Sequence, residues 1–101
     1  MAHYRLPFPE SPWIQGGHPQ ERKKSLPGVP AILIAFQPGF RDPDICLRGH
    51  SGYVLSGTFR MDYEDGFGEY RVGEAFHIDP GTAHRASNPG PVPVVLFLVS
   101  M

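Results

Sequence analysis

The sequence predicts one all-β domain, a sandwich or barrel built of short strands. Twelve glycines and twelve prolines in 101 residues leave no window for a long helix. No stretch keeps apolar residues at a period of about 3.6 residues, the spacing of a helix face. Short apolar segments bounded by glycine, proline and aspartate recur instead. A chain of this length buries a single core, so we expect one domain.

The first 30 residues differ in composition from the rest of the chain. They hold six of the twelve prolines together with the apolar residues Phe8, Trp13, Ile14 and Leu26. Proline removes a backbone donor and interrupts regular structure, so residues 1–30 are expected to form an irregular arm. The apolar side chains predict that this arm lies across the barrel or across a neighbouring subunit. Residues 31–101 are expected to form the barrel itself.

Alternating side chains predict the strands of the barrel in order. The expected strands are Ala31–Phe36, Tyr53–Tyr63 with an interruption or bend at Gly57, a return through Tyr70 and Val72, Glu74–Asp79, and Val92–Val99. Glu64, Asp65 and Gly66 form a hairpin turn signal between the second and third of these segments. After Gly57, alternation places Phe59, Met61 and Tyr63 inward.

The last of these strands is apolar on both faces. Val94, Leu96 and Leu98 point one way, and Phe97 and Val99 point the other. A barrel one sheet thick would expose one of these faces to water, so the N-terminal arm or a second subunit must cover it. We expect a homodimer.

Composition excludes several classes of protein. Nine basic and ten acidic side chains give a net charge of −1, which argues against nucleic-acid binding. The longest apolar runs, residues 29–36 and 92–99, are too short to span a bilayer, so no membrane partner is expected. The single cysteine, Cys46, forms no internal disulfide, and with no apolar leader at the N-terminus we expect a cytoplasmic protein. No phosphate-binding loop is present, so no nucleotide cofactor is expected.

A motif in the second half of the chain carries a family resemblance. Gly73, Gly81, His84 and Asn88 stand at the spacings of the second cupin motif, and Pro80 is displaced by one place from the family's proline. From Ile32 to Val99 the chain therefore resembles the small single-domain cupins, jelly-roll β-barrels. The resemblance implies that His84 points into the barrel and ligates a metal. The alternative is a metal-free histidine bonded to a buried backbone group.

The first cupin motif departs from the family pattern. Counting back from Gly57 puts His50 at the family's acid position and puts Asp44 and Cys46 where the paired histidines belong. Counting from Pro38 and Gly39 shifts the pair by one residue, and the nearer Gly57 is the better anchor. The resemblance then implies a ligand set of Asp44, Cys46, His50 and His84 for a divalent transition metal such as Fe, Zn, Mn, Ni or Cu. These donors favour Zn or Cu over Mn.

Further residues are candidates for a substrate pocket. Arg48 and Arg41 could hold an anion, although exposed loop arginines commonly have no ligand. Tyr53 has the opposite strand parity to His50, which favours packing over catalysis. His77 alternates with Phe76, and surface exposure is the simpler expectation for it.

Two functions are consistent with these patterns. The resemblance implies a metal-dependent oxygenase, isomerase or lyase that acts on a small polar molecule. The alternative is a metal-free barrel that binds or senses a small ligand, because the paired histidines of the first motif are missing. Fold alone does not choose between them.

Overall fold

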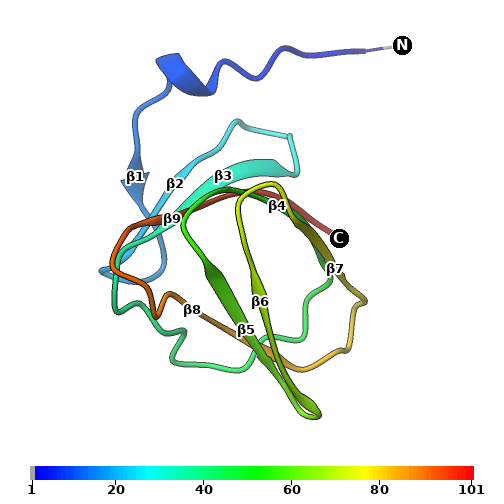
Figure 1. Cartoon of the computed structure of the whole chain (residues 1–101). Coiled ribbons are helices and arrows are strands. Elements are labelled where there is room, and N and C mark those ends of the chain that lie inside the picture. Colours follow the sequence, from blue (N-terminus) through cyan, green and yellow to red (C-terminus); the bar gives the residue numbers. More distant parts are fainter. Residues whose placement is uncertain (1) are drawn as a thin grey trace.

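The computed structural model describes residues 2–101, and within them nearly all regular structure is β (Figure 1). One short 3₁₀ turn, Phe8–Glu10, precedes the strands. The strands are β1 (Ile14–Gln15), β2 (Glu21–Lys24), β3 (Ala31–Phe36), β4 (His50–Ser56), β5 (Phe59–Tyr63), β6 (Gly66–Tyr70), β7 (Ala75–Ile78), β8 (His84–Ser87) and β9 (Val94–Ser100). Within residues 2–101 no helix is long and apolar enough to cross a membrane.

The strands form two antiparallel sheets that enclose one core. The larger sheet has the order β1-β2-β3-β9-β4-β7, and the smaller has the order β6-β5-β8. The two sheets lie around a common interior in Figure 1. Aromatic rings join them across this interior: the Phe59 centroid lies 5.8 Å from that of Phe36 and 5.5 Å from that of Phe76. The prediction of a single all-β barrel is confirmed.

The inward faces follow the predicted alternation. Val94 and Leu96 on β9 are almost completely buried, as are Phe59 and Met61 on β5. Tyr63 is partly buried and packs against this core. The alternation of apolar side chains therefore identified the core-facing positions of both sheets.

The expected strand Tyr53–Tyr63 is two strands that lie in different sheets. β4 pairs with β7 and β9, whereas β5 pairs with β6 and β8. Gly57, between them, has a φ of +77°, which ends the extended conformation and turns the chain from one sheet to the other. The interruption at this glycine was predicted, but the change of sheet was not.

Part of the N-terminal segment, β1 and β2, belongs to the larger sheet, which differs from the irregular arm expected for residues 1–30. β2 pairs with β3 through four residue pairs, from Glu21–Phe36 to Lys24–Leu33. The segment before β1 packs on the outer face of the same sheet, where the ring of Phe8 meets that of Phe97 edge to face at 6.4 Å. Lys24 Nζ donates to the carbonyl oxygen of Phe8 at 2.7 Å and lies over the Trp13 ring.

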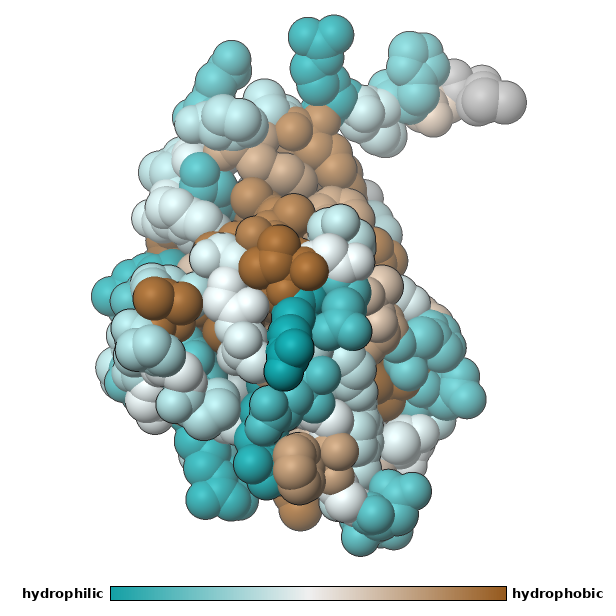
Figure 2. Space-filling view, viewed as in Figure 1, coloured by the Kyte–Doolittle hydropathy of each residue, from teal (hydrophilic) through white to brown (hydrophobic). Residues whose placement is uncertain are grey.

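This segment leaves part of the outer face uncovered. Tyr53 and Leu55, which point outward from β4, are 44% and 46% exposed. In the space-filling view, apolar residues gather below the N-terminal segment and extend to about the middle of the molecule, where hydrophilic residues follow (Figure 2). The N-terminal segment, one of the two covers that the sequence predicted for this face, therefore covers it only in part.

Candidate metal centre and ligand cavity

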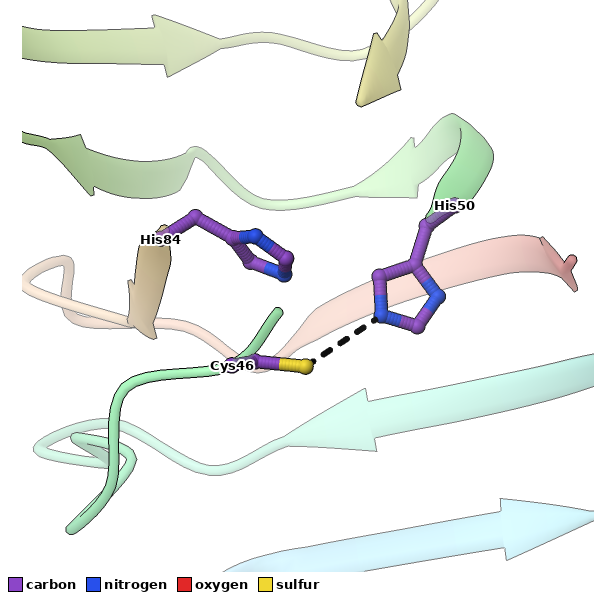
Figure 3. A group of neighbouring side chains, drawn as sticks. All are labelled: Cys46, His50 and His84. Atoms are coloured by element: carbon purple, nitrogen blue, oxygen red, sulfur yellow. Dashed lines mark hydrogen bonds between the residues drawn. The ribbon is translucent and has the colours of Figure 1, made fainter. Parts of the chain in front are cut away.

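Three side chains from separate parts of the chain meet inside the barrel. Cys46 lies in the loop before β4, His50 begins β4, and His84 begins β8. Their side chains point toward one another (Figure 3), and one ligand atom from each lies within 4.8 Å of the others. Cys46 Sγ is 3.8 Å from His50 Nε2, and the two imidazole centroids are 5.4 Å apart. We call these residues the Cys-His-His group.

Backbone contacts bring the two motifs together. The N–H of Cys46 donates to the His84 carbonyl oxygen at 2.8 Å, and the N–H of His84 donates back to the Cys46 carbonyl oxygen at 3.0 Å. Gly49 passes so close to the turn before β8 that a Cβ there would lie 2.7 Å from the Pro80 ring. A larger residue at position 49 would therefore push the loop that carries Cys46 and His50 away from His84.

A hydrogen bond from Nδ1, the ring nitrogen that does not face the Cys-His-His group, fixes the orientation of His84. Nδ1 lies 2.8 Å from the carbonyl oxygen of Thr82, and a carbonyl oxygen only accepts hydrogen bonds. Nδ1 therefore carries the proton and donates, which leaves the Nε2 lone pair available to the Cys-His-His group. A backbone carbonyl that holds the distal nitrogen is a usual support for metal-binding histidines. His84 itself is 3% exposed.

His50 is held at its other nitrogen by Ser100, whose Oγ lies 3.1 Å from Nδ1. Burial lowers the pKa of His50 below its usual value, and electrostatic repulsion of its charged form by the neighbouring His84 and Arg48 lowers it further. The imidazole is thus neutral at neutral pH, the state in which histidine can donate a lone pair to a metal. The sulfur of Cys46 accepts the backbone N–H of Arg48 at 3.4 Å.

The donor set fits a transition metal. One thiol sulfur and two imidazole nitrogens are ligands that suit Zn and Cu, and three protein ligands with a fourth position open are typical of catalytic zinc. Ligand atoms around tetrahedral zinc lie about 3.6 Å apart, given bonds of about 2.0–2.3 Å. The ligand atoms of the Cys-His-His group all lie within 4.8 Å of one another, so side-chain shifts of about 1 Å would bring the three donors to a common centre.

The group opens into a cavity of about 280 Å³ between the sheets. Apolar side chains form most of the wall, including Ile32, Phe59, Met61, Phe76, Leu96 and Leu98. Four charged residues complete the wall: Glu21 and Lys23 from β2, and Asp42 and Arg48 from the loop between β3 and β4. The cavity is thus apolar in its interior with charges on part of its wall.

Three of the four predicted ligands come together, and Asp44 does not join them. Asp44 is exposed in the loop, and its backbone N–H donates to Oδ1 of Asp42 at 3.1 Å. The aspartate therefore belongs to a local turn, which is the usual role of an acid beside proline.

Of the three residues predicted for the substrate pocket, one lies at the cavity and two do not. Arg48 lines the cavity, but Tyr53 and His77 do not. Tyr53 faces outward, opposite Phe97 on β9. His77 is exposed and lies 2.9 Å from Asp79 and 2.8 Å from Ser51. Both residues point away from the interior because β4 and β7 direct alternate side chains to opposite faces of the sheet. They do not line this cavity, in agreement with the packing role favoured for Tyr53 and the surface position favoured for His77.

Sequence reasoning missed Glu21, Lys23 and Asp42 as cavity residues. Glu21 and Lys23 lie on the same face of β2. The sequence does not show this, because the four residues of this strand are all charged and the surrounding prolines indicate an irregular segment. Pairing with β3 is what orients them, since Lys23 lies opposite Ile34 and Glu21 opposite Phe36.

The fold and the site together define a small β-barrel with histidines that converge on an internal cavity. A family model for the cupin domain matches residues 33–100, and the chain belongs to the cupin family. The resemblance drawn from the second motif is therefore confirmed.

Solved structures share this fold. The chain resembles KdgF from Halomonas sp. at 27% identity and a TM-score of 0.72, over 91% of this chain and 89% of that one. It also resembles a cupin-superfamily sugar phosphate isomerase from Silicibacter pomeroyi (14% identity, TM-score 0.76, 97% and 75% covered) and the CENP-C cupin domain of Drosophila melanogaster (16%, 0.73, 91% and 73%). No curated protein sequence matches the chain.

Proposed function

We propose that the chain is a metal-dependent cupin enzyme that acts on a small polar molecule, with the metal held by Cys46, His50 and His84. The observation that carries the proposal is the convergence of three soft or borderline donors on the wall of one cavity. Among the reaction classes of the family, this donor set favours an isomerase or lyase over an oxygenase, because sulfur and imidazole ligands suit zinc, which has no redox chemistry.

The residues of the chain have distinct parts in this function. A bound zinc ion supplies Lewis-acid polarisation of a substrate oxygen. Cys46, His50 and His84 hold the ion, and the contact between His84 Nδ1 and the Thr82 carbonyl oxygen keeps the imidazole in the tautomer that binds it. The apolar wall excludes water around the reacting atoms, which strengthens electrostatic contacts inside the cavity.

The test is metal content and metal affinity, measured on four proteins. Wild type is expected to bind about one zinc per chain, and His84→Ala is expected to weaken binding by more than about a hundredfold, since loss of an outer support alone costs 10–100-fold. Cys46→Ser should abolish the near-ultraviolet thiolate-to-metal absorption of the cobalt-substituted protein. His77→Ala, which removes an exposed histidine, is the matched control and should retain full metal content.

Wild-type protein that takes up no zinc, cobalt or copper after reconstitution would overturn this proposal. Equal metal binding by wild type and His84→Ala would also overturn it, because the ion would then be held elsewhere.

A metal-free ligand-binding barrel is the alternative. One contact within the Cys-His-His group supports it: His50 Nε2 lies 3.8 Å from Cys46 Sγ, a distance at which the two side chains can partner each other without a metal. This alternative predicts that Cys46→Ser and His84→Ala change the affinity for a ligand while neither variant differs from wild type in metal content.

A further inference from the structure

We propose that the cavity binds a small hydroxylated organic anion, with its anionic group held by Lys23 and Arg48 and its hydroxyl end directed to the Cys-His-His group. The second contact rests on the proposed metal function, whereas the first rests on the charges of the cavity wall alone.

The four charged side chains on the cavity wall differ in whether they already have a hydrogen-bond partner in the protein. Oε2 of Glu21 accepts the backbone N–H of Gly17 at 2.6 Å, and Oδ1 of Asp42 accepts that of Asp44 at 3.1 Å. Both carboxylates thus have backbone partners. Within residues 2–101, no hydrogen bond or ion pair involves the side-chain nitrogens of Lys23 or Arg48. Two cations are therefore available to an anion that enters the cavity.

The pairing of β2 and β3 directs Lys23 into the cavity. Lys23 lies opposite Ile34, whose side chain belongs to the buried core, so the two side chains share the inner face of the sheet. The aliphatic part of the lysine side chain can lie along this apolar wall while its ammonium group remains free to bind. The adjacent Lys24 points to the outer face, where it contacts the Phe8 carbonyl oxygen and the Trp13 ring.

Arg48 reaches the same cavity from the loop between Cys46 and His50. It stands two residues after Cys46 and two before His50, and it lines the cavity together with both. Its guanidinium group offers paired donors that match the oxygens of a carboxylate or a phosphate. An anion held there lies in the same space as the candidate metal ligands, which permits one small molecule to contact both.

The size and chemistry of the cavity limit the rest of the ligand. About 280 Å³ is just below the range of about 300–1,000 Å³ that is usual for drug-sized ligands, so the ligand is at most about as large as a monosaccharide. Lys23 and Arg48 are the only cationic side chains among the residues that line the cavity, and both are assigned to one anionic group, so the remaining apolar wall suits a ligand with a single anionic end. A hydroxyl or carbonyl oxygen at the other end provides the atom that the Cys-His-His centre would contact.

The experiment compares three probes that share one carbon skeleton: glycerol, glycerate and glycerol 3-phosphate. Titrations followed by NMR of zinc-loaded protein at neutral pH are expected to show at least tenfold tighter binding of one or both anions than of glycerol. Lys23→Gln and Arg48→Gln should each weaken anion binding about tenfold or more, because each removes a charge-assisted hydrogen bond. Lys24→Gln, on the opposite face of the same strand, should leave the affinities unchanged. The ratio of glycerate to glycerol 3-phosphate affinity distinguishes a carboxylate site from a phosphate site.

Three results would overturn the inference: binding of none of the probes, equal binding of glycerol and the anions, or an anion preference that survives both Lys23→Gln and Arg48→Gln. Repeating the titrations after chelation separates this inference from the proposed function. Failure of zinc binding with a persistent anion preference refutes the metal enzyme and leaves the anion site. Zinc binding without an anion preference refutes the anion site alone.

Discussion

Asn88, the last residue of the second motif, is predicted to stabilise the fold rather than to contact a ligand. Asn88 directly follows β8 and is 1% exposed. Nδ2 donates to the carbonyl oxygens of Phe36 and Val92, both at 2.9 Å, and Oδ1 accepts the backbone N–H of Gly90 at 3.1 Å. One amide thus joins the end of β3 to the loop that leads into β9.

The three contacts set the cost of Asn88→Ala. A hydrogen bond contributes about 0.5–1.5 kcal/mol to stability, and a buried group left without a partner costs about 1–3 kcal/mol. The buried carbonyl of Phe36 loses its side-chain donor, while the loop groups can turn to water. We therefore expect a loss of about 2–4 kcal/mol in the free energy of unfolding. In a domain of this size the melting temperature should fall by about 10–25 °C.

Urea unfolding of Asn88→Ala, Asn88→Asp and Ser87→Ala measures this cost. Asn88→Asp keeps the shape but turns a carboxylate oxygen toward two carbonyl oxygens, so its loss should equal or exceed that of the alanine variant. Ser87, the neighbouring residue, makes no side-chain hydrogen bond within residues 2–101, and Ser87→Ala should cost about 1 kcal/mol or less. Wild-type stability of Asn88→Asp would refute the reasoning, because the amide donors would then contribute nothing.

Three further predictions concern other parts of the barrel. Burial raises the pKa of Tyr63, and its hydrogen bond to Tyr70 raises it further. As the pH rises above about 10, this tyrosine therefore ionises in the unfolded chain before it does in the folded one, and the free energy of unfolding falls. Tyr63→Phe should make the free energy of unfolding, measured with urea, depend less on pH in this alkaline range. Gly57→Ala should cost at least about 1–2 kcal/mol, because φ is +77° and a Cβ would lie 2.7 Å from a carbonyl oxygen; an unchanged melting temperature would contradict this. A dimer formed through the outer face of the larger sheet should become monomeric in Leu55→Glu, as measured by light scattering, and a monomeric wild type would refute the dimer.

The sequence could predict the strands because their side chains alternate over a single buried face. Ala31–Phe36 has the predicted bounds, and the inward set of Phe59, Met61 and Tyr63 is the observed one. Alternation cannot show that a chain has changed sheets, because the apolar period continues on both sides of Gly57. The positive φ of this glycine, a property of the backbone, is what separates β4 from β5. The sequence therefore specified the faces of the strands better than their partners.

The candidate metal ligands were predictable for a similar reason. The spacing of the two cupin motifs fixes the positions of the candidate ligands along the chain. The family resemblance also implies that the segments with Cys46 and His50 lie beside the segment with His84. Asp44 stands only two residues from Cys46, but the loop turns its side chain away from the barrel, and no spacing rule includes that turn. Residue type and spacing thus predicted four candidate ligands, three of which form the Cys-His-His group. The backbone of the loop directs the fourth, Asp44, away from the barrel.

The charged wall of the cavity lay beyond prediction because it depends on a long-range pairing. Glu21 and Lys23 belong to a segment whose prolines indicate an irregular arm, and only the antiparallel pairing of β2 with β3 makes it part of the barrel. The matched family region, residues 33–100, also begins after this strand. β2 therefore completes the cavity, and the segment around Phe8 covers part of the outer face of the sheet. A truncated chain that begins at residue 31 would lose Lys23, one of the two cations available to an anion. If the anion site is as proposed, such a chain would bind anions more weakly even where it folds and keeps the Cys-His-His group.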